Sequence, residues 1–149
     1  MPAILVDTNI LVYAYDRGEF IKQQQAIRVL EFLQTTGTGR LGMQCLAEFF
    51  RVTTKGTSPI LPVQQAKEQT EELAHSWQVL NLTPQIILEA TRGVRDHQFS
   101  YWGAQIWASA RLNQIPLVLS EDFQDGANIE GVRFLNPFAP EFEIQKIVG

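Results

Sequence analysis

The most constraining feature of the sequence is a pair of short, continuous apolar runs, each of which is soon followed by an acid. Residues 3–6 read Ala-Ile-Leu-Val directly before Asp7, and residues 116–119 read Pro-Leu-Val-Leu just before the segment that holds Asp122. Unbroken apolar runs of this length are typical of strands that are buried on both faces of a parallel sheet. A chain with such strands must cover both faces of its sheet.

The segments between these runs have helical periodicity. Residues 21–34, for example, carry apolar side chains at i, i+3, i+4 and i+7. We predict strands at 3–6, 40–43, 79–82, 116–119 and 132–135, and helices at 10–15, 21–34, 46–54, 63–76, 86–95 and 104–112. Alternating strands and helices predict an α/β fold, a single-domain three-layer sandwich whose central, mostly parallel sheet has helices on both faces. The 149 residues suit one domain, 1–149.

Composition excludes several classes of protein. The lone cysteine, Cys45, excludes an internal disulfide framework and a Cys-rich zinc site. No apolar run approaches the ~20 residues that cross a bilayer, and residues 1–7 lack the basic and apolar regions of a signal peptide. We therefore expect a soluble, cytoplasmic protein. The net charge of −4 argues against passive nucleic-acid binding through a basic surface, but not against an enzyme that meets nucleic acid through metal ions.

Three acids attract attention because of where they fall. Ligands of open α/β sheets bind outside the carboxyl ends of the strands, where Asp7 and Asp122 meet if their strands are neighbours. Glu48 stands in the apolar stretch 46–50 and is expected to be partly buried. Buried ionised carboxylates are costly unless a cation compensates them, and Mg²⁺ and Mn²⁺ prefer oxygen ligands. Such ions support phosphodiester hydrolysis.

Each acid also has an ordinary structural interpretation. Asp7 can cap the helix that follows it. Glu48 can pair with Arg51 on the surface of a helix, and Asp122 can be a turn residue. No single acid is specific, so the functional interpretation depends on their arrangement.

The order of the motifs resembles a known family. Residues 6–11, Val-Asp-Thr-Asn-Ile-Leu, resemble the opening motif of PIN-domain nucleases, and residues 46–49, 99–110, 119–126 and 136–138 resemble later motifs of its VapC toxin branch. The resemblance covers nearly the whole chain. It implies a PIN-like domain with Mg²⁺- or Mn²⁺-dependent endoribonuclease activity. It also implies an RNA substrate, a cognate antitoxin protein and a homodimer, with no membrane association.

The resemblance also assigns residues by position. Asp7, Glu48 and Asp122 match the catalytic, metal-binding acids, and Asp125 is a less secure fourth ligand. The supporting polar residues are Thr8, Asn9 and Ser120.

One position departs from the family pattern. Gly103 stands where the family has an aspartate, and glycine has no side chain to bind metal. The chain is then a natural variant with reduced cleavage, an inactivated form, or one in which another acid substitutes, with Asp125 preferred to Asp96. We predict low nuclease activity for this sequence.

Two other functional classes compete with this interpretation. In one, the chain is a catalytically defunct PIN-like module that binds antitoxin or RNA. In the other, it is a phosphoacceptor protein. Aspartyl phosphatases, however, need a second acid where Asn9 stands, and receiver domains need an acceptor Asp after a central strand, whereas residues 79–82 lead into Thr-Pro.

The expected environments of the tryptophans and histidines bear on whether they can serve the site. Trp107 lies on a helical apolar stripe and is expected in the core, whereas Trp102, beside the departed position, is the better candidate for an exposed aromatic that stacks on RNA bases. His75 and His97 are expected to be core or solvated residues rather than metal ligands.

Overall fold

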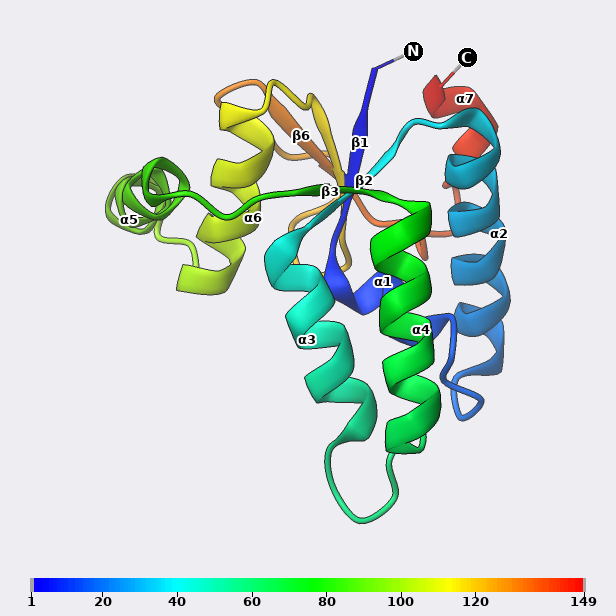
Figure 1. Cartoon of the computed structure of the whole chain (residues 1–149). Coiled ribbons are helices and arrows are strands. Elements are labelled where there is room, and N and C mark those ends of the chain that lie inside the picture. Colours follow the sequence, from blue (N-terminus) through cyan, green and yellow to red (C-terminus); the bar gives the residue numbers. More distant parts are fainter. Residues whose placement is uncertain (1, 149) are drawn as a thin grey trace.

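The computed structural model describes residues 2–148, and these contain one mostly parallel sheet of six strands (Figure 1). Its strands are β1 (Ile4–Val6), β2 (Gly39–Gly42), β3 (Gln78–Leu80), β4 (Leu117–Leu119), β5 (Asn128–Ile129) and β6 (Val132–Leu135). Their order in the sheet is β3-β2-β1-β4-β6-β5, and only the β5–β6 pair is antiparallel.

Helices cover both faces of this sheet. They are α1 (Thr8–Tyr13), α2 (Phe20–Thr36), α3 (Met43–Thr54), α4 (Val63–Ser76), α5 (Pro84–His97), α6 (Tyr101–Leu112) and α7 (Ile144–Val148). In Figure 1, α5 and α6 lie on one side of the strands, and α2 and α4 lie on the other. This arrangement confirms the predicted three-layer α/β sandwich. Within residues 2–148, no helix has the length and apolarity that a membrane crossing requires.

The predicted elements are present, but some boundaries differ. The predicted strand 40–43 ends at Gly42, because Met43 already begins α3, and the strand predicted at 79–82 is Gln78–Leu80. Two short elements, β5 and α7, were not predicted. The β5–β6 hairpin turns through Glu130 and Gly131, both with positive φ (51° and 89°), as a two-residue hairpin loop requires. Glutamate gives little sequence signal for that conformation.

The core explains why the acids of the sequence end up together. All three residues of β1 and of β4 are buried, as the continuous apolar runs predicted. The two strands are direct neighbours, and Val6 pairs with Leu119 at their carboxyl ends. Trp107 is completely buried, and its Nε1 donates to the Ile129 carbonyl at 3.1 Å, which confirms its predicted place in the core.

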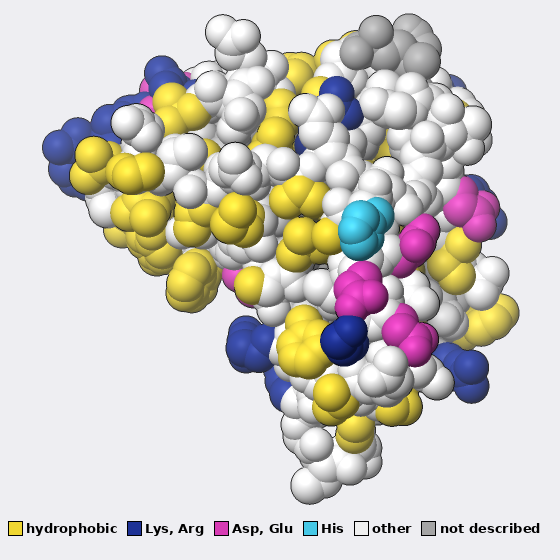
Figure 2. All heavy atoms as spheres, in the orientation of Figure 1, with side chains coloured by type: hydrophobic (Ala, Val, Ile, Leu, Met, Phe, Trp, Pro, Cys, Tyr) yellow, Lys and Arg dark blue, Asp and Glu magenta, His cyan; other side chains and the backbone are white. Residues whose placement is uncertain are grey.

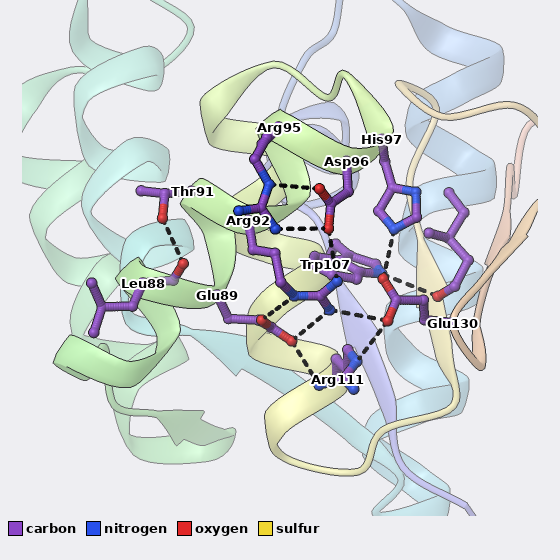
Figure 3. Close-up of polar contacts among 11 residues, drawn as sticks. Leu88, Glu89, Thr91, Arg92, Arg95, Asp96, His97, Trp107, Arg111 and Glu130 are labelled. Atoms are coloured by element: carbon purple, nitrogen blue, oxygen red, sulfur yellow. Dashed lines mark hydrogen bonds and ion pairs between the residues drawn. The ribbon is translucent and has the colours of Figure 1, made fainter.

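An ionic network joins α5 to α6 and to the β5–β6 turn (Figure 3). The Arg92 guanidinium lies 2.7 Å from Glu89, 3.2 Å from Asp96 and 3.0 Å from Glu130. His97 Nε2 also lies 2.6 Å from a carboxylate oxygen of Glu130. Asp96 and His97 therefore serve this network, and neither lies with the acids that the sequence singled out.

Candidate active site

The site begins where β1 and β4 end side by side. The Asp7 amide donates to the Leu119 carbonyl at 2.9 Å, which places Asp7 beside the residue that follows β4. That residue, Ser120, donates its hydroxyl to Asp7 Oδ2 at 2.7 Å. Its Oγ also accepts the Asp122 amide at 3.0 Å. A buried serine thus links two acids that are distant in the sequence.

Asp7 is a helix cap as well as a site residue. Its backbone is extended, and its Oδ1 accepts the Thr8 amide at 2.7 Å at the start of α1. Asn9, on the first turn of α1, donates its Nδ2 to Asp122 Oδ2 at 3.1 Å. The other side-chain atom, Asn9 Oδ1, is buried without a hydrogen-bond partner in the described part of the chain. An orphaned acceptor on a residue that contacts Asp122 is an oxygen available to a ligand.

Glu48 reaches the site from α3. It is half-buried and accepts a hydrogen bond from Gln44 Nε2 at 2.5 Å, one turn earlier on the helix. Gln44 in turn accepts a hydrogen bond from Gln105 of α6. Among residues 2–148 no ion pair joins Glu48 to Arg51, so the alternative surface pair is not formed.

The three acids share one cavity of about 390 Å³. It opens between α3 and the start of α6, where Figure 2 shows the surface hollowed between the lobe of α5 and α6 and the part that carries α3. A second hollow of about 340 Å³ also contains Asp7, Glu48 and Asp122, so the acids form the wall between the two. The other residues that line the first cavity are Gln44, Gln98, Phe99, Ser100, Trp102, Gly103 and Phe123.

The ionisation of Asp7 reflects this crowding. The pKa of Asp7 is raised to about 6, chiefly by burial and to a smaller extent by the negative charges of Asp122 and Glu48. The hydrogen bonds from Ser120 and Thr8 act in the opposite direction and only partly offset the burial. The uncompensated carboxylate is therefore costly in the absence of a cation.

The donors suit a hard, water-rich cation and not a closed metal cage. Within residues 2–148, no three His, Cys, Asp or Glu side chains converge closely enough to enclose an ion by themselves. Mg²⁺ needs no such cage, because it is commonly held by one or two carboxylates and keeps several waters. Carboxylates beside the orphaned Asn9 Oδ1 fit Mg²⁺ or Mn²⁺ better than zinc, which prefers nitrogen and sulfur.

Gly103 lines the same cavity, which is where the resemblance implied an acid. It lies in the first turn of α6, and its amide donates to the Ser100 Oγ that caps the helix, at 3.2 Å. A Cβ at this position would lie 3.1 Å from Ser100 Oγ and 3.2 Å from Phe123 Cζ. Phe123 stacks on Phe134 with ring centroids 3.9 Å apart, so a side chain at position 103 requires a small shift of a packed ring.

Neither substitute acid joins the cluster. Asp125 is exposed, and its Oδ1 accepts the Asn136 amide at 2.9 Å. It is not among the residues that line the two hollows. Asp96 is held by Arg92 and Arg95 in the ionic network of α5 and α6. The structure therefore gives no support to either acid as a replacement for the carboxylate missing at Gly103.

Two cavity residues were not anticipated from the sequence. Gln44 precedes Glu48 by four residues, and this i, i+4 spacing was an available signal on a predicted helix. Gln98 ends α5 with a positive φ of 60°, a conformation that no local sequence pattern indicated.

Comparison with known proteins places this geometry in a recognisable fold. No family model and no curated protein matches the chain. Solved structures do match: a toxin–antitoxin complex from Klebsiella pneumoniae has a TM-score of 0.67 at 19% identity, covering 91% of this chain and 98% of that one. VapC20 of Mycobacterium tuberculosis, a sarcin–ricin-loop-cleaving toxin, has a TM-score of 0.65 at 18% identity, covering 88% and 99%.

A third match extends the same likeness. FitAcB from Neisseria gonorrhoeae has a TM-score of 0.63 at 16% identity, covering 91% of this chain and 99% of that one. Identities this low establish a shared fold and no more. The chain thus shares the fold of these matched proteins, which agrees with the PIN-like fold that the motifs at residues 6–11 and 119–126 predicted.

Proposed function

We propose that the chain is a Mg²⁺- or Mn²⁺-dependent endoribonuclease toxin of a toxin–antitoxin pair, and that Gly103 lowers its activity. The observation that carries this proposal is the shared cavity of Asp7, Glu48 and Asp122. These acids come from three separate segments and meet at the carboxyl edge of a parallel sheet, in a fold that the matched toxins share. One matched protein, VapC20 of Mycobacterium tuberculosis, is a sarcin–ricin-loop-cleaving toxin.

The residues of the cavity have distinct roles in this proposal. Asp7, Glu48 and Asp122 would hold a hydrated divalent ion between them, with one or two of their carboxylates as direct ligands. The bound ion would supply Lewis acidity and activate water for phosphodiester hydrolysis. Ser120 fixes Asp7 through its hydroxyl hydrogen bond. Asn9 orients Asp122 and has a free Oδ1 to offer. Thr8 fixes the other Asp7 oxygen through its amide.

Gly103 weakens this arrangement by removing one carboxylate from the cavity wall. A site with fewer negative charges binds divalent cations less tightly, and the missing group cannot be replaced by Asp96 or Asp125 where they lie. Reduced activity follows from weaker metal binding and not from a disrupted fold, because Gly103 keeps its capping hydrogen bond to Ser100.

We further propose that the chain acts in the cytoplasm as a homodimer and is neutralised by a cognate antitoxin protein. The matched structures include complexes of toxin with antitoxin, which supports the protein partner. Exposed apolar side chains on α2 and α5 offer contact surface for such partners; they include Phe20, Ile21 and Leu88.

The decisive experiment compares the chain with Gly103→Asp, and with Gly103→Asn as a matched control of equal size without charge. We expect Gly103→Asp alone to bind Mn²⁺ at least about tenfold tighter in calorimetry, since one added hard ligand at short range exceeds ~1.4 kcal/mol. We expect the same variant to cleave total RNA faster. Robust cleavage by the unaltered chain that Asp7→Ala abolishes would overturn the claim of reduced activity.

The alternative is a catalytically defunct PIN-like module that engages antitoxin or RNA. The lack of three metal-binding side chains around one point in residues 2–148 favours it. If neither the chain nor Gly103→Asp binds Mn²⁺ or cuts RNA, this alternative replaces the nuclease.

A further inference from the structure

Trp102 is an aromatic side chain that the core does not use. Trp77 and Trp107 are 7% and 0% exposed, whereas Trp102 is 61% exposed. It lies on the wall of the acidic cavity beside Gly103, and it forms a T-shaped pair with Tyr101, with ring centroids 5.1 Å apart at 77°. A large ring in water at the mouth of a cavity is a ready stacking surface, because its apolar face gains free energy when it is covered.

The wall that holds Trp102 is neutral. Gln98, Ser100 and Trp102 form it at the junction of α5 and α6, in the cavity that the acids also line. The left-handed backbone of Gln98 ends α5, and its amide donates to the Val94 carbonyl at 3.0 Å. A carboxamide side chain both donates and accepts hydrogen bonds, as base edges require.

Charge decides which part of an RNA this wall can bind. Among the described residues that line the cavity, none is a Lys or an Arg. Phosphates are bound chiefly by basic side chains and backbone amides, so this wall offers them little. An aromatic face with neutral hydrogen-bonding groups suits a nucleobase instead, because every base has a face that can stack.

We propose that this wall is a subsite for one unpaired nucleobase, which stacks on Trp102 with its edge towards Gln98 while its phosphate lies at the acids. The inference rests on the proposed ribonuclease function and narrows its substrate class to single-stranded or loop RNA. A cavity of about 390 Å³ lies near the lower end of small-ligand sites and admits a nucleotide, not a duplex. A paired base would first have to leave its stack, at a cost in free energy.

The test measures binding, separately from cleavage, with three RNA probes in Mg²⁺ buffer. The probes are a short mixed-sequence single strand, its fully paired duplex, and an abasic strand of the same length and charge, each checked for integrity on a gel. Binding is followed by anisotropy of a terminal dye and by tryptophan emission, to which the one exposed tryptophan of the chain responds most. We expect the single strand to quench this emission and to bind about 5- to 100-fold tighter than the abasic strand, the range of one base–aromatic stack.

Two variants form the matched comparison. Trp102→Leu keeps apolar bulk but removes the aromatic face, and Phe50→Leu changes another exposed aromatic side chain, of 36% exposure, that lies outside the cavity. We expect Trp102→Leu to lose about 5- to 100-fold in affinity for the single strand and to bind the abasic strand as before. Phe50→Leu should behave as the parent does with both probes. The loss of affinity caused by Trp102→Leu, compared between the single strand and the abasic strand, isolates the contribution of base stacking.

The outcomes separate this inference from the proposed function. Equal affinity for all three probes, or an equal loss with the abasic strand in Trp102→Leu, overturns the base subsite. If tryptophan emission changes with protein concentration and not with RNA, Trp102 is a contact between two copies of the chain. That result also overturns the base subsite. If Gly103→Asp cleaves RNA and Trp102→Leu has no effect on binding, only the base subsite is overturned. If RNA stacks on Trp102 but Gly103→Asp does not cleave it, the subsite is supported and the proposed nuclease activity is overturned.

Discussion

Replacing Asp7 by asparagine should stabilise the metal-free protein at neutral pH. The pKa of Asp7 rises from 3.8 to about 6, chiefly because the carboxyl is buried. A shift of one pKa unit corresponds to about 1.4 kcal/mol, so the ionised carboxylate disfavours folding by up to about 3 kcal/mol at pH 7. Asparagine has the same shape and no charge, and its Oδ1 can still accept the Thr8 amide hydrogen bond.

The pH dependence of this effect has a defined sign. The folded pKa lies above the unfolded one, so the stabilising protonated form is fully present below about pH 4 and is lost as pH rises through about 6. The variant carries no such dependence. The two proteins should therefore have similar stability near pH 4 and diverge to as much as about 3 kcal/mol above pH 7, or roughly 6–12 °C in Tm for a chain of this length.

Urea denaturation at several pH values between 4 and 8, in EDTA, measures this divergence. Asp125→Asn is the control, because Asp125 is exposed and lies outside the cavity. Added Mg²⁺ should narrow the gap, since it stabilises only the protein that binds it. A variant that is less stable than the parent at pH 7.5, or a gap that is constant with pH, would refute the account of Asp7.

Three further predictions concern the rest of the fold. Glu130→Gln should cost about 1 kcal/mol of stability at pH 7 after allowance for solvent screening. The pKa of Glu130 is lowered to about 2, chiefly by Arg92 and then by His97, so this cost should vanish on acidification from about pH 4.5 towards 2, which urea titrations across this range test. Cys45, whose pKa burial raises to about 12, should react with a thiol reagent only at the rate of unfolding. Gly39→Ala should lower stability by about 2 kcal/mol or more in thermal melts, since its Cβ would overlap the Trp77 ring.

The sequence predicted the sheet better than the contacts between its elements. The runs at residues 3–6 and 116–119 were recognisable because burial on both faces leaves no polar position. Their adjacency depends on strand order, which no local pattern contains. The β5–β6 hairpin was missed because Glu130 adopts a positive φ that tertiary contacts with Arg92 and His97 help to hold.

In the candidate site, too, local patterns predicted the positions of residues better than the contacts between segments. The positions of Asp7 and Asp122 at strand ends followed from periodicity, whereas the place of Asp125 did not, because its partner Asn136 lies in a different segment. Gly103 was identified as a departure only by resemblance. Its crowding by Phe123 depends on a ring stacked on Phe134 of β6, and nothing in the sequence near position 103 indicates that contact.

The two interpretations of Asp7, as helix cap and as metal ligand, are not exclusive. The residue caps α1 through Thr8, yet a serine or asparagine would cap a helix as well without a charge. Its carboxylate is instead buried, with Asp122 and Glu48 near enough to raise the cost of ionisation further. Local rules are broken mainly where function requires it. A cap that is destabilising at neutral pH, close to the orphaned Asn9 oxygen, is what the proposed cation site requires, because a bound cation would neutralise the acids.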